Sequence, residues 1–321
     1  MFKRMVTLAF LLLLIAALTA CGGADGGTAD EQPEGGDTGE AQENEAEDQA
    51  SGEDVDSLVM GFVPSQDAAN LADTAKPLAD KLSEELGIPV EAQVMTDFVG
   101  LVEAMRTQNV DIGFLNPFGF VQGEKRADIE VILKSMRDGE DSYRAQYSAP
   151  ADSEIEDLED LVNNPGYTWA YADTLSTSGY LFPASQLMDL GVEDVDNHFQ
   201  HSQVGGHDNA MIALLDGQAD FATTFEDARD IMEDDYPDVR DRIKVIGYTD
   251  PIPNDTISVR SDLSDELKNK IKEAFLSFND DEEMLDVLFD IYSWTGITEA
   301  TSEDYDIVRS VYDRFEDQLN E

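Results

Sequence analysis

The sequence has very little positive charge. Its 321 residues include 20 lysines and arginines against 70 aspartates and glutamates, which gives a formal net charge of −50. Such a chain repels phosphate backbones and anionic lipid surfaces, so we expect neither nucleic acid nor an anionic membrane surface as a partner. The acidic residues accompany apolar positions at helical spacing and are expected on solvated helix faces. We also expect an extracellular protein of a saline habitat, where salt screens the self-repulsion.

Cysteine is almost absent, because Cys21 is the only one. It follows a basic start (MFKRM), an apolar run (VTLAFLLLLIAALTA) and small residues, an order typical of a bacterial lipoprotein signal. We therefore predict a signal peptide over residues 1–20 and a lipid on Cys21 that anchors the chain to the outer face of a membrane. An uncleaved transmembrane anchor is the alternative, and the run is short for one. A lipidated Cys21 leaves no thiol for disulfides, metal binding or catalysis.

The segment from Gly22 to Asp56 lacks lysine and arginine and has almost no large apolar residue. It cannot bury enough apolar surface to offset the entropy of ordering, and its like charges repel one another. We predict a disordered acidic tether over residues 21–56. An acidic interaction tail is the alternative.

The next part of the chain alternates between short apolar runs and amphipathic segments. We expect helices at 67–87 and 96–109 and strands at 58–63, 88–95, 110–116 and 129–136. This alternation predicts a mostly parallel sheet with right-handed crossovers. The pattern then repeats, with helices expected at 176–191 and 205–217 and strands at 167–173, 198–203, 219–225 and 243–251.

The last part has one expected strand at 256–263 and helices at 265–278, 282–292 and 303–319. One strand is too few for a separate domain, so we expect this part to complete the first unit. The fold class is then α/β and bilobal, with lobe I over 57–142 plus 255–321 and lobe II over 143–254. Two connecting segments, near 143–149 and 249–255, would form the hinge of a binding protein.

The loop at residues 176–179 has the features of an anion-binding site. Ser176, Thr177, Ser178 and Gly179 follow an expected strand and open an expected helix, where hydroxyls, backbone N–H groups and the helix dipole favour negative charge. An oxyanion would be held there by uncharged donors. The alternative is an ordinary N-cap and turn. A second glycine loop opens the helix that begins near His207.

The combination of segments resembles a known family. GFVPS, STSGYLFP, GGHDNAMIALLDGQADFA and DPIPNDTISVRSDLS occur in the order seen in substrate-binding proteins of phosphonate, phosphite and phosphate ABC transporters. The resemblance runs from about residue 58 to beyond residue 275. It implies a type II periplasmic-binding-protein fold, no enzymatic activity, no cofactor or metal, a phosphorus oxyanion as ligand, and an ABC permease with its ATPase as partners. We expect a monomer.

The resemblance also implies roles for single residues. The turn of Ser176, Thr177 and Ser178 would grip the oxyanion, together with His207 and Asp255. A carboxylate repels an anion unless the anion donates a proton to it, so Asp255 would accept a ligand O–H and reject sulfate, which has none. Closure would add first-lobe residues: Ser65, Phe98 and Asn116.

The sequence departs from the family at two tyrosines. Phe98 stands where phosphonate-binding members have one, and Leu115 or Phe118 stands where they have another. The loss of these phenols favours phosphate, phosphite or a small apolar phosphonate over an aminoalkyl phosphonate. Glu226 or Asp227 could contact a ligand amine, although a solvated carboxylate is the simpler interpretation.

Three other interpretations remain open. A serine of the turn, His207 and Asp255 could form a hydrolase triad, although the sequence has no GxSxG motif. His198 and His201 have a spacing that occasionally binds metal, but in a strand they would face opposite sides. A lipoprotein that senses the same ligand and signals to a membrane receptor would have the same sequence features as a transport protein.

Overall fold

The computed structural model describes residues 55–319. The predicted signal peptide, Cys21 and nearly all of the predicted tether lie outside the described residues. Within the described part of the chain, no helix is long and apolar enough to cross a membrane.

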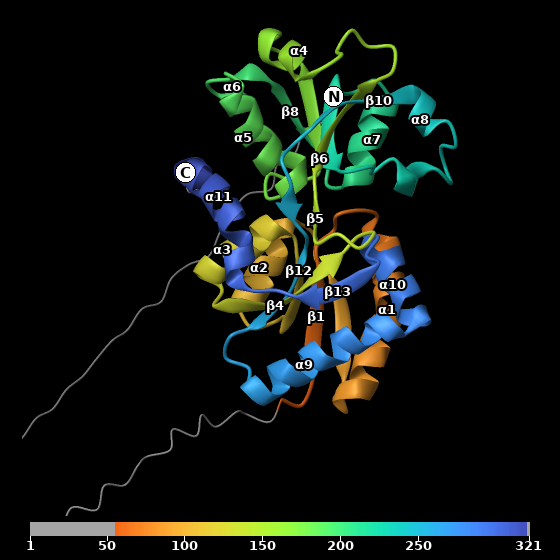
Figure 1. Ribbon diagram of the computed structural model, residues 1–321, viewed down its shortest axis with the longest axis vertical. Coiled ribbons are helices and arrows are strands. Elements are labelled where there is room, and N and C mark those ends of the chain that lie inside the picture. Colours follow the sequence, from red (N-terminus) through yellow and green to blue (C-terminus); the bar gives the residue numbers. More distant parts are fainter. Residues whose placement is uncertain (1–54, 320–321) are drawn as a thin grey trace, which may run out of the picture. The chain divides into compact units, whose positions relative to one another are not determined.

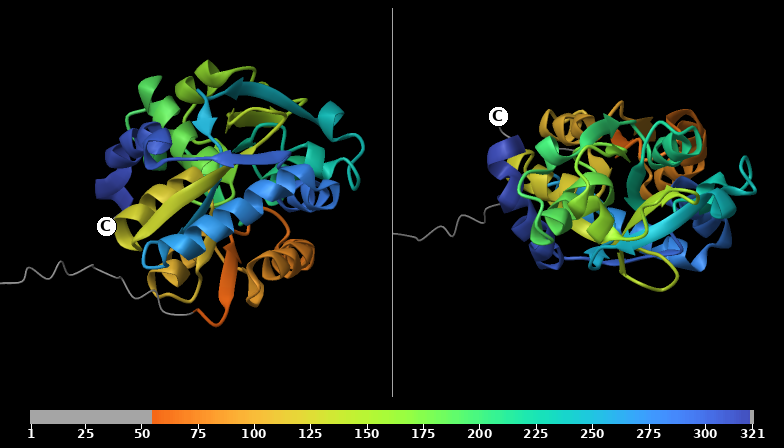
Figure 2. Two further views of the ribbon diagram at one scale, coloured as in Figure 1. Left: turned by 60° about the horizontal axis from the view of Figure 1, so that its bottom comes forward. Right: turned by 90° about the horizontal axis from the view of Figure 1, so that it is seen from above.

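The larger of two main sheets has six strands in the order β13-β4-β12-β3-β1-β2 (Figure 1). Its strands are β1 (Leu58–Phe62), β2 (Val90–Val94), β3 (Ile112–Leu115), β4 (Ile129–Met136), β12 (Thr256–Arg260) and β13 (Gly296–Glu299). Its helices are α1 (Ala68–Leu86), α2 (Phe98–Arg106), α3 (Pro117–Arg126), α9 (Asp265–Ser277), α10 (Glu282–Tyr292) and α11 (Asp306–Leu319). Helix α1 packs against α9 and α10, although these helices are far apart in the sequence (Figure 2).

Local sequence explains how these elements begin and end. Asp67 caps α1 by accepting from the backbone N–H groups of Ala69 and Asn70. Gly87 ends α1 in the left-handed region, with φ of 72°, at the last residue of the helix predicted at 67–87. Asp97 caps α2 by accepting from the backbone N–H of Gly100, close to the start of the helix predicted at 96–109.

The prediction of a mostly parallel sheet holds only for part of the larger sheet. Strands β2, β1 and β3 are parallel neighbours. Strand β12 runs antiparallel between β3 and β4, and β13 runs antiparallel beside β4. Helix α3 and strand β13 were not predicted, because the phenylalanines of GFLNPFGF belong to a strand end and a helix start and GITE is only four residues long.

The second sheet has five strands in the order β10-β6-β9-β7-β8. Its strands are β6 (Ala145–Pro150), β7 (Thr168–Tyr171), β8 (Gln200–Gln203), β9 (Phe221–Phe225) and β10 (Ile243–Tyr248). Its helices are α4 (Leu158–Asn163), α5 (Phe182–Asp189), α6 (Val195–His198), α7 (His207–Leu215) and α8 (Val239–Arg242), with a π-helical turn at Thr177–Leu181. Strands β8, β7 and β9 are parallel, whereas β6 is antiparallel to β9 and β10.

Two short strands connect the sheets: β5 (Ser142–Tyr143) pairs antiparallel with β11 (Ile252–Pro253). The first connection is shorter than the predicted 143–149, because residues 145–150 already form β6 of the second sheet. Asn254 links the two connecting segments through hydrogen bonds. Its fully buried side chain donates to the carbonyls of Ser135 and Glu140, and its backbone N–H donates to Asp141.

Helix α11 contacts both sheets' helices. Tyr312 packs against Phe118 of α3, and Phe315 packs against Tyr180. The Arg314 guanidinium donates to Ser185 and Asp189 of α5, which lies beside α11 in Figure 2. The C-terminal helix is therefore bonded to elements on either side of the β5–β11 connection.

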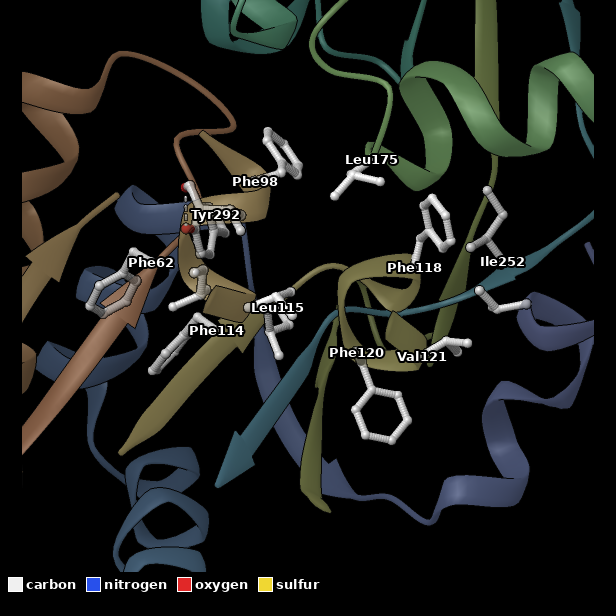
Figure 3. Packing of buried hydrophobic residues seen from close by; sticks show 14 of the residues in the cluster. Phe62, Phe98, Phe114, Leu115, Phe118, Phe120, Val121, Leu175, Ile252 and Tyr292 are labelled. Carbon is white, nitrogen blue, oxygen red and sulfur yellow. Dashed lines mark hydrogen bonds between the residues drawn. The ribbon is translucent and has the colours of Figure 1, made fainter. Parts of the chain in front are cut away.

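An aromatic cluster fills the core beside the larger sheet. Phe114 of β3 stacks on Phe62 of β1, with ring centroids 4.4 Å apart (Figure 3). It also stacks on Trp294, with ring centroids 5.4 Å apart. Phe275 of α9 meets the same ring edge-on. These contacts join the first strands of the sheet to the C-terminal helices.

Replacement of Phe114 with alanine should therefore lower the free energy of unfolding by about 3–5 kcal/mol, because it leaves a cavity between the stacked rings. Urea denaturation of the purified protein would measure the loss. Val99→Ala is the control, since Val99 is 47% exposed and should change stability by less than about 0.5 kcal/mol. Equal losses in the two variants would contradict this account of the core.

Candidate functional site

A small cavity lies where the carboxyl ends of β1 and β3 face the loop that follows β7. Its volume is about 40 Å³. Its wall consists of Val63, Ser65, Gln66, Phe98, Phe114, Leu115, Asn116, Arg137, Tyr143, Ser176, Thr177, Ser178, His207, Phe225, Asp255 and Tyr292. Ligands of open α/β sheets bind in this kind of position.

The Ser-Thr-Ser loop enters its helix through a π-helical turn rather than directly as an α-helix. Ser176 is the N-cap, and its hydroxyl accepts from the backbone N–H of Gly179 at 3.0 Å. The Gly179 N–H is thus used within the turn, and Gly179 is absent from the cavity wall, which differs from its predicted role as an anion donor. The side chains of Ser176, Thr177 and Ser178 are buried and line the cavity.

Thr177 connects the loop to the other sheet. Its hydroxyl oxygen accepts from the Asn116 side-chain amide at 2.8 Å and from the Phe118 backbone N–H at 3.0 Å. The Asn116 amide also donates to the carbonyl of Leu175. Asn116 is buried, and its Oδ1 has no hydrogen-bond partner in the described part of the chain.

His207 lies at the first position of α7 and is only 4% exposed. Its backbone N–H donates to the Ser65 carbonyl at 2.9 Å, a second connection between the sheets. Burial, helped by the nearby Arg137 charge, lowers the pKa of His207 to about 3, so the imidazole is neutral at pH 7. Its Nε2 is 3.4 Å from the Ser176 hydroxyl, and its Nδ1 has no partner among residues 55–319.

Asp255 forms an ion pair that the sequence did not reveal. Its Oδ2 accepts from the Arg137 guanidinium at 2.8 Å, and the two side chains are 19% and 20% exposed. Arg137 follows β4 directly and also donates to the side chain of Asn254 and the carbonyl of Tyr292. The cavity wall therefore includes a cationic side chain, contrary to the expectation that only uncharged donors would line it.

Two phenols that were not predicted as site residues, Tyr143 and Tyr292, lie in the cavity wall. Tyr143 is on the connecting strand β5, where its ring lies under the Arg137 guanidinium at 5.2 Å, and it lines the cavity together with Ser178 and Thr177. The Tyr292 hydroxyl donates to the Val63 carbonyl at 2.7 Å (Figure 3). Burial, with the charge of Asp255, raises the pKa of both tyrosines, so both remain protonated.

Most of the predicted site residues come together in this cavity, although they lie on different elements. Those that line it are Ser65, Phe98, Asn116, Ser176, Thr177, Ser178, His207 and Asp255. Of the two residues considered for the second tyrosine position, Leu115 lines the cavity and Phe118 does not.

The other candidates lie elsewhere. Glu226 pairs with Arg144, and Asp227 pairs with Arg229, outside the cavity wall. His198 and His201 each approach a backbone carbonyl, at Leu161 and Val195. Among the described residues, no group of histidine, cysteine and carboxylate side chains could hold a metal ion.

Two sheets of mixed direction, joined by two crossings with a polar cavity between them, define the class of two-lobed solute-binding proteins. The family model described as "ABC transporter, phosphonate, periplasmic substrate-binding protein" matches residues 60–305, and the chain belongs to this family. It has the type II periplasmic-binding-protein fold, and the family is extracytoplasmic.

Individual relatives agree with this assignment. The chain is 27% identical over 279 residues to the "Phosphate-import protein PhnD" of Mycolicibacterium smegmatis, covering 80% of this chain and 85% of that protein. The crystal structure of a binding protein component of an ABC phosphonate transporter from Pseudomonas aeruginosa is similar with a TM-score of 0.72, at 27% identity over 79% of this chain and 85% of that one. PhnD1 of Prochlorococcus marinus, solved with methylphosphonate, shares the fold at 17% identity and a TM-score of 0.73, covering 81% and 98%.

The buried imidazole makes stability depend on pH. Because the pKa of His207 is about 3 when folded and near 6.5 when unfolded, the unfolded chain binds more protons between these values. Stability from this group is full above pH 6.5 and falls toward pH 3 by up to about 1.4 kcal/mol per pH unit. Chemical denaturation of wild type and His207→Gln at pH 7.5, 6 and 5 should show the difference between them shifting in favour of the variant as pH falls. Parallel curves would contradict the neutral, buried state.

Proposed function

We propose that this protein captures a phosphorus oxyanion outside the cytoplasm and delivers it to an ABC permease and its ATPase. The candidate ligands are phosphate, phosphite and a small phosphonate. The observation that carries the proposal is the cavity wall, in which the Ser176–Ser178 hydroxyls and His207 of one sheet meet Asn116, Arg137 and Asp255 of the other. The names of two relatives, a phosphate-import protein and a structure with methylphosphonate, support the same ligand class.

The size of the cavity supports a compact ligand. Its volume of about 40 Å³ is small. A tetrahedral oxyanion with at most a small apolar substituent suits this volume. Phe98, Leu115 and Phe225 supply apolar wall against which such a substituent could lie.

In this proposal the ligand is held by both lobes and closes them together. Lobe I comprises 57–142 with 255–321, lobe II comprises 143–254, and the β5–β11 pair is the hinge. Ser176, Thr177, Ser178 and His207 form the second-lobe side of the site. Ser65, Phe98, Asn116 and Asp255 form the first-lobe side, and the contacts of Thr177 and His207 across the cavity are those of the closed state.

Asp255 is proposed to select ligands that carry a proton. Its Oδ1 has no hydrogen bond among the described residues, so it can accept the O–H of hydrogen phosphate, phosphite or a singly protonated phosphonate. Sulfate has no proton to donate, and it would leave this acceptor unpaired beside an anion.

Two further parts of the proposal concern the context of the protein. We propose that a lipid on Cys21 anchors it to the outer face of the membrane, and that the acidic segment before residue 57 serves as a spacer. We propose that it acts as a monomer, without a cofactor or metal, and that its acidity suits a saline habitat.

The hydrolase alternative is poorly supported by the geometry. A catalytic triad needs a histidine that is oriented by the carboxylate, whereas Asp255 bonds Arg137 and the Nδ1 atom of His207 has no partner among the described residues. A histidine whose pKa is about 3 is also a weak general base at neutral pH. A sensing lipoprotein would use the same site, and genes for a permease and an ATPase beside this one would favour transport.

Isothermal titration calorimetry with phosphate, phosphite, methylphosphonate, 2-aminoethylphosphonate and sulfate at high salt tests the proposed function. We expect one or more of the first three compounds to bind. Sulfate should bind at least about tenfold more weakly than they do, because an unpaired acceptor costs about 1–3 kcal/mol. No heat from any phosphorus compound, or equal affinity for sulfate, would refute the proposal.

The role of Asp255 has its own test. Asp255→Asn can donate a hydrogen bond to an oxyanion, so the ratio of phosphate to sulfate affinity should fall by about tenfold. Asp262→Asn is the matched control, because Asp262 pairs with Arg260 away from the cavity and should leave the ratio unchanged. A ratio in Asp255→Asn equal to that of wild type would remove Asp255 from ligand selection.

A further inference from the structure

Arg137 and Asp255 are the only permanently charged side chains among the described residues that line the cavity. The remaining wall is apolar or carries hydroxyl and amide groups, and His207 is neutral at pH 7 because its pKa is about 3. The formal charges of the pair cancel. A chain with a net charge of −50 therefore presents a cavity wall without net charge to an incoming anion.

The guanidinium of Arg137 is already engaged by the protein. Its Nη2 donates to Asp255 Oδ2 at 2.8 Å and to the Tyr292 carbonyl at 3.2 Å, and its Nη1 donates to Asn254 Oδ1 at 3.3 Å. The ring of Tyr143 lies beneath it. These four partners fix the guanidinium from different sides.

Asp255, in contrast, retains bonding capacity. The ion pair uses Oδ2, whereas Oδ1 makes no hydrogen bond within residues 55–319. Its backbone carbonyl is also fixed, because it accepts from the Ser135 N–H. Of the two charged groups, the carboxylate has an oxygen without a hydrogen bond in the described residues, whereas the guanidinium is held in place by three hydrogen bonds and the ring of Tyr143.

We propose that Arg137 is a positioning residue that sets the ligand class of the site by acting through Asp255. It cancels the carboxylate charge, so that an anion can bind beside it, and holds Oδ2, so that Oδ1 serves as the acceptor. The class selected is a compact oxyanion that carries an acidic O–H. This inference deepens the proposed function and rests on it.

The inference requires that the effect of Arg137 depends on Asp255. Without the arginine, an uncompensated carboxylate would face the ligand and repel it. Without both charges, the repulsion would be gone, although the preference for a protonated ligand would be gone as well. An arginine that bound the ligand directly would instead matter equally whether or not Asp255 was charged.

A double-mutant cycle on the full chain tests this, with calorimetric titration of inorganic phosphate and of sulfate into wild type, Arg137→Gln, Asp255→Asn and the double variant. Arg137→Gln should weaken phosphate binding by about tenfold or more, whereas the same change in the Asp255→Asn background should weaken it by about threefold or less. The double variant should bind phosphate more tightly than Arg137→Gln and should no longer reject sulfate.

Two further variants control the cycle. Arg106→Gln makes the same change of charge at an exposed pair with Glu103 and should leave both affinities unchanged. Arg137→Lys keeps the charge and loses the planar fork, so it should bind phosphate more tightly than Arg137→Gln and still reject sulfate. If Arg137→Gln does not fold, as thermal unfolding would show, Arg137→Lys and the charge-balanced double variant carry the test.

The outcomes separate the inference from the proposed function. Wild type that binds no phosphorus compound refutes both. Wild type that binds phosphate, with Arg137→Gln equal to it, refutes only the role of Arg137. Equal losses of phosphate affinity in the two backgrounds also refute this role, because Arg137 would then act on the ligand without Asp255. A loss of sulfate rejection in Arg137→Lys refutes it as well.

Discussion

The hydroxyl of Thr177 is the contact on which the site depends. It accepts one hydrogen bond from the side chain of Asn116 and one from the backbone of Phe118, and all three residues are buried. Through this oxygen, the loop after β7 is bonded to the loop after β3, and the space between them becomes a cavity with walls from both sheets. Without such contacts each sheet would present only half of the wall to solvent.

Most of the fold follows from the pattern of the sequence, because strands and amphipathic helices carry their periodicity locally. The helix that ends at Gly87 and the cap at Asp97 are examples, since a glycine stop and a capping aspartate are signals within a few residues. Strand direction is different. β12 lies between β3 and β4 because of pairing across more than a hundred residues, and no local signal indicates whether such a pair is parallel.

The candidate site also has residues that the sequence indicates and residues that it does not. Ser176 to Ser178 and His207 belong to loops whose composition and position suggest anion binding, so sequence could indicate them. Arg137, Tyr143 and Tyr292 carry no local signal, although Arg137 directly follows a predicted strand at the edge where ligands bind. Only tertiary packing brings these three together with Asp255. Two phenols therefore lie in the cavity wall although Phe98 and Leu115 supply none.

Tyr143 belongs both to the connection between the sheets and to the wall of the cavity. The residue belongs to one of the two strands that connect the sheets, and its side chain touches Arg137 on one side and Ser178 on the other. Any rotation about that strand displaces the wall of the cavity at once. If the proposed function is right, a ligand in the cavity would favour one arrangement of the two sheets, and a permease could recognise the loaded protein by that arrangement alone.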